Sequence, residues 1–264
     1  MGRFWTILFL TVPILGVAVF VWAMQTPTHW LPEDVSAHGR IIDTLFYTIL
    51  YLTGAIFVAT SLALFWFMWK YDAEQNTEET VKFLHGSHTL EIVWSILPAA
   101  TLLFIAIFQM NAWADAKMLR PEENGQPKPP LAWVTGRQFE WRIRYAGNDG
   151  IVGTEDDVFT VNELHVPVDE EVVFAIKSED VLHSFFLPNL RVKQDVVPGM
   201  KQLLWFKPVE TGEYDIVCAE LCGWGHYKMK GRLTIESRDD FDRWLSDTRK
   251  AQQQASYTPI EDDE

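Results

Sequence analysis

The sequence predicts a helical hairpin in a membrane followed by an all-β domain, and three observations support this division. Long apolar runs without charged residues occur only within residues 1–114. Short β-branched segments, separated by Gly, Pro, Asn and Asp, begin after residue 130. The charge is also divided unevenly: residues 1–114 hold 4 basic and 8 acidic side chains, whereas residues 115–264 hold 18 and 28, a net charge of −10.

The composition excludes several classes of protein. With 48% apolar residues, the 264-residue chain is too hydrophobic for an intrinsically disordered protein. Its 2 cysteines form at most one bridge, so the fold is not a disulfide-stapled scaffold. The net charge of −14 repels phosphate, and we therefore expect no nucleic-acid partner.

The first apolar run covers residues 4–23 and follows a single Arg3. Two interpretations fit this run equally. It is either a secretory signal peptide, with Val21-Trp22-Ala23 as a small-residue cleavage site, or a retained transmembrane helix of about 20 residues. Both interpretations treat residues 1–24 as a segment separate from the hairpin.

Residues 46–69 and 92–112 form two further uncharged runs, each long enough to cross about 30 Å of hydrocarbon. The alternative is a buried core helix, but no polar face recurs at helical spacing in either run. The connection between them, residues 70–89, is short and charged. We therefore expect residues 40–114 to form an antiparallel hairpin in the lipid bilayer, with the large C-terminal part on the side opposite the connection.

After a Pro- and Glu-bearing linker at residues 115–130, residues 131–237 contain the short segments that predict a β-sandwich or barrel. The predicted strands are Trp141–Tyr145, Val158–Val161, Glu171–Ile176, Gln202–Phe206, Tyr214–Val217 and Arg232–Ile235. Residues 238–264 follow as a C-terminal helix and an acidic tail. The helix, Asp239–Ala251, places apolar residues on one stripe, and we expect the tail, Glu261–Glu264, to be disordered.

The strongest functional signal is a motif that contains both cysteines of the chain: Cys218-Ala-Glu-Leu-Cys222-Gly-Trp-Gly-His226-Tyr-Lys-Met229. Thiolate, imidazole and thioether form a soft ligand set, which favours copper over zinc or magnesium. The Cys-x3-Cys spacing also suits zinc, but zinc sites rarely use Met, and a structural zinc site needs a second ligand pair.

A single blue-copper ion uses one Cys, two His and a weak axial Met. The second thiolate here points to two metal ions that share two bridging sulfurs. A further His is then needed, and His183 is the best candidate, although a single His on an apolar strand is more often a core residue. A disulfide between Cys218 and Cys222 is the alternative, because a tightly folded loop brings two such cysteines within reach.

These residues resemble subunit II of the haem–copper cytochrome c oxidases, and the resemblance covers residues 40–245. It rests on His183, then Cys218-x-Glu220-x-Cys222-x3-His226-x2-Met229, with three further segments in family order: Glu91-Ile-Val-Trp-Ser-Ile-Leu-Pro98, Glu179-Asp-Val-Leu-His-Ser184 and Lys193-Gln-Asp-Val-Val-Pro-Gly199. The resemblance implies a transmembrane hairpin followed by a cupredoxin domain, a Greek-key barrel, with a binuclear copper centre named CuA. It implies as side-chain ligands His183, Cys218, Cys222, His226 and Met229, with Glu220 binding through its backbone carbonyl.

The resemblance also implies the function and the partners. The chain would be the electron-transfer subunit of a proton-pumping cytochrome c oxidase, accepting electrons from a c-type cytochrome. It would pass them to haem in subunit I, where oxygen is reduced to water. The Glu220 carboxylate would reach a magnesium ion at the boundary with subunit I. The cupredoxin domain would lie on the outer, periplasmic side of a bacterial-type inner membrane.

Two further positions follow from the resemblance. Glu91 would be the entrance of a proton path into subunit I, the alternative being an acid that favours a helix N-terminus. The family's aromatic patch, Gly-His-Gln-Trp-Tyr-Trp, is replaced here by Gly136-Arg-Gln-Phe-Glu-Trp141. Phe139 therefore stands where the first Trp usually receives the electron. Trp141 is the second candidate for this role, or else a strand residue packed in the barrel.

Several alternatives remain at the level of the sequence. The acidic loop 148–157 offers oxygen ligands for calcium but lacks EF-hand spacing. The charge of −10 suits docking of a basic cytochrome, or only solubility. One alternative function is a membrane-anchored copper chaperone for oxidase assembly, but such a protein would place its His downstream of the two cysteines. Another is a quinol-oxidase subunit, which would lack the copper ligands. No Cys-x-x-Cys-His motif for attached haem c is present in this sequence.

Overall fold

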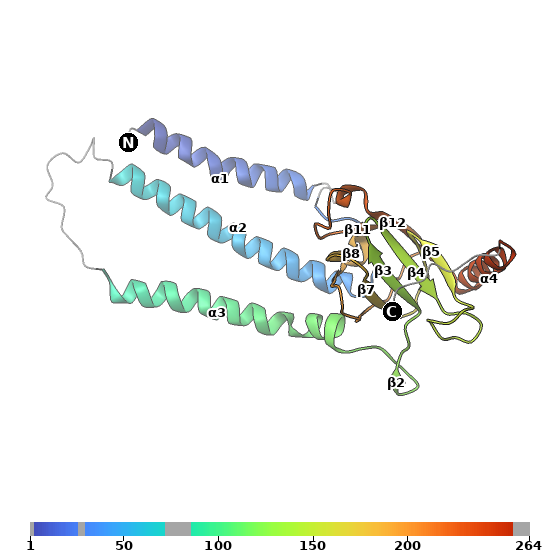
Figure 1. Ribbon diagram of the computed structural model, residues 1–264. Coiled ribbons are helices and arrows are strands. Elements are labelled where there is room, and N and C mark those ends of the chain that lie inside the picture. Colours follow the sequence, from blue (N-terminus) through green and yellow to red (C-terminus); the bar gives the residue numbers. More distant parts are fainter. Residues whose placement is uncertain (1–2, 26–29, 72–85, 256–264) are drawn as a thin grey trace. The chain divides into compact units, whose positions relative to one another are not determined.

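The computed structural model describes residues 3–25, 30–71 and 86–255, which form apolar helices followed by a β-sheet domain (Figure 1). The predicted fold class is therefore confirmed. The chain divides into two compact units: Met1–Pro32 with Asp43–Asn111, and Glu33–Ile42 with Ala112–Glu264. Most of the predicted connection 70–89 and the acidic tail lie outside the described residues.

Each of the three predicted apolar runs is a helix long and apolar enough to cross a membrane. The helices are α1 (Arg3–Met24), α2 (Gly39–Lys70) and α3 (His88–Trp113). Helix α2 begins at Gly39 rather than near Phe46, because Arg40 and Asp43 interrupt the apolar run without interrupting the helix. None of the residues of α3 is buried, as expected of a helix that meets lipid or other subunits.

The expected linker, residues 115–130, contains two short pieces of structure. Helix α3 continues into a π-helical turn, Ala114–Met118, and the carbonyl oxygen of Asp115 accepts a hydrogen bond of 3.1 Å from the indole of Trp205. Asn124 and Gly125 then have φ angles of 54° and 74°, which suit a tight hairpin turn. They join the two-residue strands β1 (Glu122–Glu123) and β2 (Gln126–Pro127).

The β domain consists of two 5-stranded sheets. The first has the strand order β10 (Gln202–Phe206), β7 (Val172–Ser178), β3 (Ala132–Arg137), β4 (Glu140–Tyr145) and β5 (Val158–Val161). The second has the order β6 (Glu163–Pro167), β12 (Lys230–Glu236), β11 (Gly212–Cys218), β8 (His183–Leu187) and β9 (Val192–Val196). Each sheet has one parallel pair, β3 with β7 and β6 with β12.

One cluster of buried side chains joins the two sheets. Alternation along β4 turns Trp141, Ile143 and Tyr145 inward, where they meet residues of the second sheet such as Phe185 and Leu233. The six predicted strands are present, with ends that differ by up to two residues. The strands β3, β6, β8 and β9 were not predicted as such, and two of them, β6 and β9, lie at sheet edges, where polar residues and Pro are tolerated.

Helix α4 (Arg238–Gln254) lies where the sequence predicts a helix over Asp239–Ala251. The Ser237 side chain caps its first turn by accepting a hydrogen bond of 3.2 Å from the backbone N–H of Asp240. Phe241 is buried in the core, and Trp244 stacks on His165 of β6 with ring centroids 3.8 Å apart. The apolar stripe of the helix is thus covered by the β domain.

A segment before α2 also belongs to the β domain, which the sequence did not indicate. Val35 is fully buried, its backbone N–H donates to the carbonyl oxygen of Asn189 at 2.9 Å, and its carbonyl oxygen accepts from Val209 at 2.9 Å. Ser36 forms an antiparallel bridge with Pro208. These backbone contacts hold residues 33–37 against two loops of the β domain, one at residue 189 and one at residues 207–209.

Candidate metal centre

The cysteine motif forms the loop between β11 and β12. The two strands pair in an antiparallel register from Gly212 opposite Ile235 to Val217 opposite Lys230. Beyond this ladder, the backbone N–H of Cys218 donates to the carbonyl oxygen of Met229 at 3.2 Å, so the loop is closed at its base. A 3₁₀ turn at His226–Lys228 then folds the loop back toward the cysteines.

His183 reaches this loop from the neighbouring strand. It is the first residue of β8, which pairs with β11 so that Phe185 lies opposite Cys218. Its Nδ1 atom lies 3.9 Å from the sulfur of Cys218. His183, Cys218 and Cys222 can each place a ligand atom within 4.8 Å of the other two, and over residues 3–25, 30–71 and 86–255 this is the one such group of three or more.

The remaining predicted ligands lie around the same two sulfurs. The Cys222 sulfur is 3.6 Å from His226 Nδ1 and 3.7 Å from Met229 Sδ. The Cys218 sulfur is 3.3 Å from the carbonyl oxygen of Glu220. The structure thus brings together all six residues that the sequence nominated as ligands.

The two sulfurs suit a shared metal. Both cysteines are free and buried, and their sulfurs are 3.9 Å apart. This separation is far longer than a disulfide bond of about 2.05 Å. It is shorter than about 4.6 Å, the span of two metal–thiolate bonds of about 2.3 Å, so one ion can contact both sulfurs. The donor set of thiolate, imidazole and thioether is the one that copper prefers.

Electrostatics distinguish the two thiols. Burial alone would raise the pKa of Cys218, but hydrogen bonds from His183 and from backbone groups outweigh it and lower the pKa to about 6. Burial raises the pKa of Cys222 to about 12, with a further contribution from the neighbouring Cys218 thiolate. Without metal, the site therefore holds one thiolate and one thiol at neutral pH.

Asp180 orients the histidine. Its carboxylate lies 2.8 Å from His183 Nε2, which directs Nδ1 toward Cys218. The same carboxylate accepts hydrogen bonds from the backbone N–H groups of Gln138 at 2.7 Å and Val181 at 2.6 Å. Burial opposes the positive charge of His183, but hydrogen bonds to Cys218 and Asp180 raise its pKa. Such outer partners fix the tautomer and the direction of a ligating His.

The predicted aromatic residues occupy different depths. Phe139 lies against residues 218–229, the loop that carries the predicted ligands and is called the ligand loop below. A Cβ atom at Gly225 would come within 2.5 Å of the Phe139 ring, so only glycine allows this contact. Trp141 has 0% exposed surface. Its ring packs against the rings of His183 and Phe185, with centroid distances of 5.9 Å and 5.1 Å. Trp141 is therefore a core residue behind the histidine and has no surface with which to meet another protein.

The sequence did not predict a role for three residues near the site. Asp180 orients His183, and its position three residues before that His was a usable signal. The amide of Gln138 donates to the carbonyl oxygen of Cys222 at 2.5 Å, a contact between distant segments that no local pattern indicates. Trp224 lies between two predicted ligands and contacts Phe139, with ring centroids 5.1 Å apart.

Two other predicted positions lie away from the cysteines. Glu91 is in the first turn of α3, with its carboxylate 4.0 Å from His88. In the acidic loop 148–157, the carboxylate of Asp157 pairs with Arg144 at 2.5 Å and accepts from the backbone of Gly153 at 2.6 Å. Backbone donors and an arginine thus occupy oxygens that a calcium ion would need.

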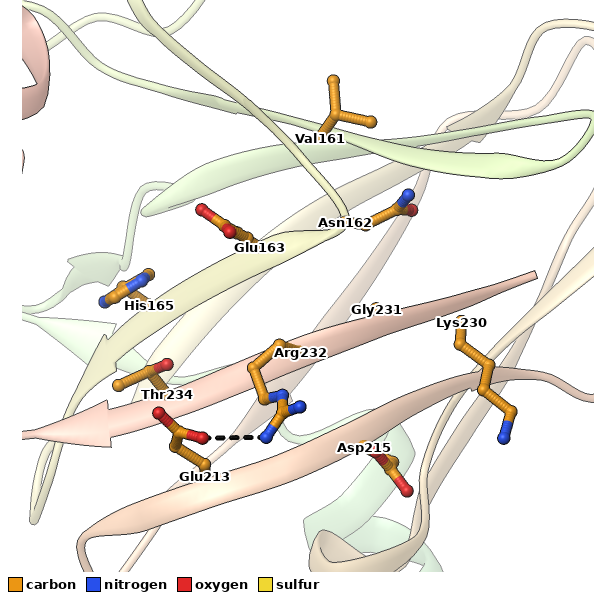
Figure 2. A pocket seen from close by; sticks show the side chains of 10 residues that line it. All are labelled: Val161, Asn162, Glu163, His165, Glu213, Asp215, Lys230, Gly231, Arg232 and Thr234. Carbon is orange, nitrogen blue, oxygen red and sulfur yellow. Dashed lines mark hydrogen bonds and ion pairs between the residues drawn. The ribbon is translucent and has the colours of Figure 1, made fainter. Parts of the chain in front are cut away.

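An open groove of about 610 Å³ follows the strands β6, β12 and β11 (Figure 2). Its charges have both signs, and Arg232 pairs with Glu213 at 2.8 Å in an exposed contact of little energetic weight. The groove includes none of the predicted ligands; it is lined by Val161, Asn162, Glu163, His165, Glu213, Asp215, Lys230, Gly231, Arg232 and Thr234.

The Asp180 contact predicts a loss of metal affinity. Asp180→Asn keeps the size of the side chain but leaves one acceptor oxygen where two serve His183, Gln138 and Val181. We expect the copper affinity of the full-length chain in detergent, measured by competition with a chelator, to fall about 10- to 100-fold. Glu179→Gln is the matched control, because that carboxylate pairs with Arg142 instead. Equal affinities of Asp180→Asn and wild type would contradict this role.

The thiol pKa values predict a pH dependence of the metal-free chain. A lowered pKa means that the Cys218 thiolate persists at pH 7 and is lost as the pH falls through about 6. The thiolate absorbance near 240 nm should therefore show one acidic transition, absent in Cys218→Ser and retained in Cys222→Ser. A transition that survives in Cys218→Ser would show that another group is responsible.

Comparisons with known proteins agree with this geometry. Residues 135–237 match the family model of the periplasmic domain of cytochrome c oxidase subunit II, and residues 21–112 match that of its transmembrane domain. An alternative cytochrome c oxidase subunit 2 from Bradyrhizobium diazoefficiens is 26% identical, covering 88% of each chain. A cytochrome c oxidase subunit 2 from Thermostichus vulcanus is 27% identical, covering 87% of this chain and 80% of that protein.

Among solved structures, the periplasmic domain of subunit II of the cytochrome oxidase of Bradyrhizobium japonicum is similar, with 25% identity and a TM-score of 0.43. It covers 50% of this chain and 99% of that chain. The family assignment rests on the two family models, which together cover most of the chain and both of its predicted parts. The chain therefore belongs to the cytochrome c oxidase subunit II family and is an electron-transfer subunit of an oxidase.

Proposed function

We propose that this chain holds a binuclear CuA centre and accepts electrons there from a c-type cytochrome. The observation that supports this best is the convergence of four further donors on two free cysteine sulfurs that lie 3.9 Å apart. The proposed ligands are His183, Cys218, Cys222, His226, Met229 and the backbone carbonyl of Glu220.

The distribution of donors favours two ions over one. His183 Nδ1 and the carbonyl oxygen of Glu220 lie 3.9 Å and 3.3 Å from the Cys218 sulfur, and His226 Nδ1 and Met229 Sδ lie 3.6 Å and 3.7 Å from the Cys222 sulfur, so both sulfurs have donors beside them. A single blue-copper ion uses one thiolate and would leave the second without a role. When bound, a copper pair supplies a one-electron carrier.

The chain's own contribution is to hold these donors in a dry and rigid setting. His183 and both cysteines are buried, with exposed fractions of 0%, 6% and 3%. Trp141 and Phe185 pack behind the histidine, and the β11–β12 ladder fixes the base of the loop. Donors that do not have to rearrange allow electron transfer with little structural change.

The partners follow from the same proposal. Electrons would leave toward haem in subunit I, where oxygen is reduced to water in a proton-pumping complex. The half-buried Glu220 would offer its carboxylate to a magnesium ion at that boundary. The β domain would face the periplasm from a bacterial inner membrane, and its net charge of −10 over residues 115–264 would favour approach of a basic cytochrome.

The first test is copper content. The purified full-length chain, given copper, should turn purple, bind two copper ions and show a mixed-valence EPR signal. Cys222→Ser should abolish this spectrum, because one bridging sulfur is lost, while Ser61→Ala in α2 serves as a control. A colourless protein with a Cys218–Cys222 disulfide would falsify the proposal.

A second part of the proposal concerns Glu91. It lies 21 residues before Ala112, where the second unit begins, so the helix separates the two points by about 32 Å, the thickness of a hydrocarbon layer. If the copper domain lies outside, a span of this length would bring Glu91 to the inner surface, where protons are taken up. We propose that it is the entrance of a proton path into subunit I.

This role predicts a loss of proton uptake. In the assembled oxidase, Glu91→Gln should slow proton uptake and oxygen consumption several-fold, because the variant carries no exchangeable charge, while the copper spectrum stays unchanged. Asp115→Asn, near the opposite end of the same helix, is the control. Proton uptake at the wild-type rate in Glu91→Gln, measured with a pH-sensitive dye, would rule out this role.

A further inference from the structure

Trp224 is an exposed aromatic residue with no part in the core. Its exposed fraction is 78%, and among the tryptophans between residues 131 and 237, all of which the structure describes, it alone is exposed. Exposure of apolar rings on α1, α2 and α3 is expected of helices that meet lipid. No such reason applies to the β domain. Leu221 and Tyr227 of the same loop are also exposed, at 76% each, and several exposed apolar side chains on one loop indicate a contact surface.

The ring is nevertheless held in place. Phe139 meets it edge to face, with centroids 5.1 Å apart and an interplanar angle of 67°. The ammonium group of Lys228 lies 4.7 Å from the centroid of the Trp224 ring. The ring is therefore presented toward solvent in one orientation, at little further entropic cost when a partner binds.

Trp224 is also connected to the metal centre by two short routes. Along the chain, it stands two residues from Cys222 and two residues from His226. Through space, it contacts Phe139, and Phe139 in turn lies against the backbone of Gly225. Trp224 is the outermost group of this stack, and its inner end is the backbone of Gly225, the residue before the proposed ligand His226.

We propose that Trp224 is the group through which the donor passes its electron to the metal centre, with Phe139 as its support. This inference rests on the proposed function and names the site of electron uptake within it. One electron leaves the reduced cofactor of the donor and one electron is gained by the centre, with no bond formed or broken. The partner is thus an electron-donor protein that presents the apolar edge of its cofactor at its surface.

The two residues nominated from the sequence fit this role less well. Trp141 is fully buried behind His183, so it cannot touch a donor. Phe139 is half-buried beneath Trp224 and lies against the ligand loop, which makes it an intermediate rather than a surface contact. The chain thus has an indole at the surface although phenylalanine stands where the family usually has tryptophan.

The test uses the assembled oxidase with Trp224→Ala and Trp224→Phe. Stopped-flow mixing with a reduced soluble cytochrome c should give a rate constant for reduction of the copper centre at least tenfold lower in Trp224→Ala, with most of the rate restored in Trp224→Phe. The Kd for the oxidised cytochrome should rise several-fold in Trp224→Ala. Copper content, the EPR signal and reduction by ascorbate with a small mediator should be unchanged.

Trp133→Ala is the matched control, because this tryptophan also lies beneath a lysine, Lys201 at 5.2 Å, but on β3 away from the ligand loop. A wild-type rate constant and Kd in Trp224→Ala would overturn the inference. So would loss of other oxidase subunits during purification of that variant, which would show that a subunit covers the ring. A wild-type oxidase that holds no copper would instead overturn the proposed function itself.

Discussion

The backbone pairing of β11 with β12 and β8 positions the residues that converge in the candidate metal centre. The Cys218–Met229 hydrogen bond closes the ligand loop at the end of the β11–β12 ladder, and the β8–β11 register places His183 beside it. A side chain that binds a metal loses rotamer entropy. Here the backbone that carries the proposed ligands is already fixed by strand pairing, so no backbone entropy is lost in addition. The core beneath them, with Trp141 and Phe185 against the histidine, supports the same arrangement from the other side.

The site also resolves a conflict between burial and charge. Two thiolates side by side in an apolar core would repel each other, and the pKa is accordingly lowered for Cys218 and raised for Cys222. Hydrogen bonds from His183 and backbone groups stabilise the single charge. A cation that binds both sulfurs removes the reason for the asymmetry, so metal binding and deprotonation of Cys222 are coupled.

Much of this architecture could be predicted from the sequence, because its strongest signals are local. The three apolar runs are uninterrupted, and the proposed ligands from Cys218 to Met229 lie within one loop. His183 lies 35 residues before Cys218, and no rule of spacing joins the two; their contact depends on strand pairing. For Trp141 the sequence left two interpretations open, and its burial decides for the packed strand residue. The exposure of Trp224 was not indicated, because its flanking glycines carry no hydrophobic pattern. Residues 33–37 carry no strand pattern, and only their backbone contacts show that they are part of the β domain.

The closure at Cys218 and Met229 has a consequence for how such centres spread among proteins. All proposed donors except His183 lie in residues 218–229, the loop that joins the adjacent strands β11 and β12. This loop could therefore be exchanged as one unit. A different β-sandwich could accept it if its own hairpin ended in the same register. The host would have to supply a histidine at the start of the neighbouring strand, a carboxylate that orients it as Asp180 does here, and a flat ring to cover the glycines of the loop. Most of the proposed donor set could therefore be moved between scaffolds by exchanging one loop, provided that the new scaffold offers these supports.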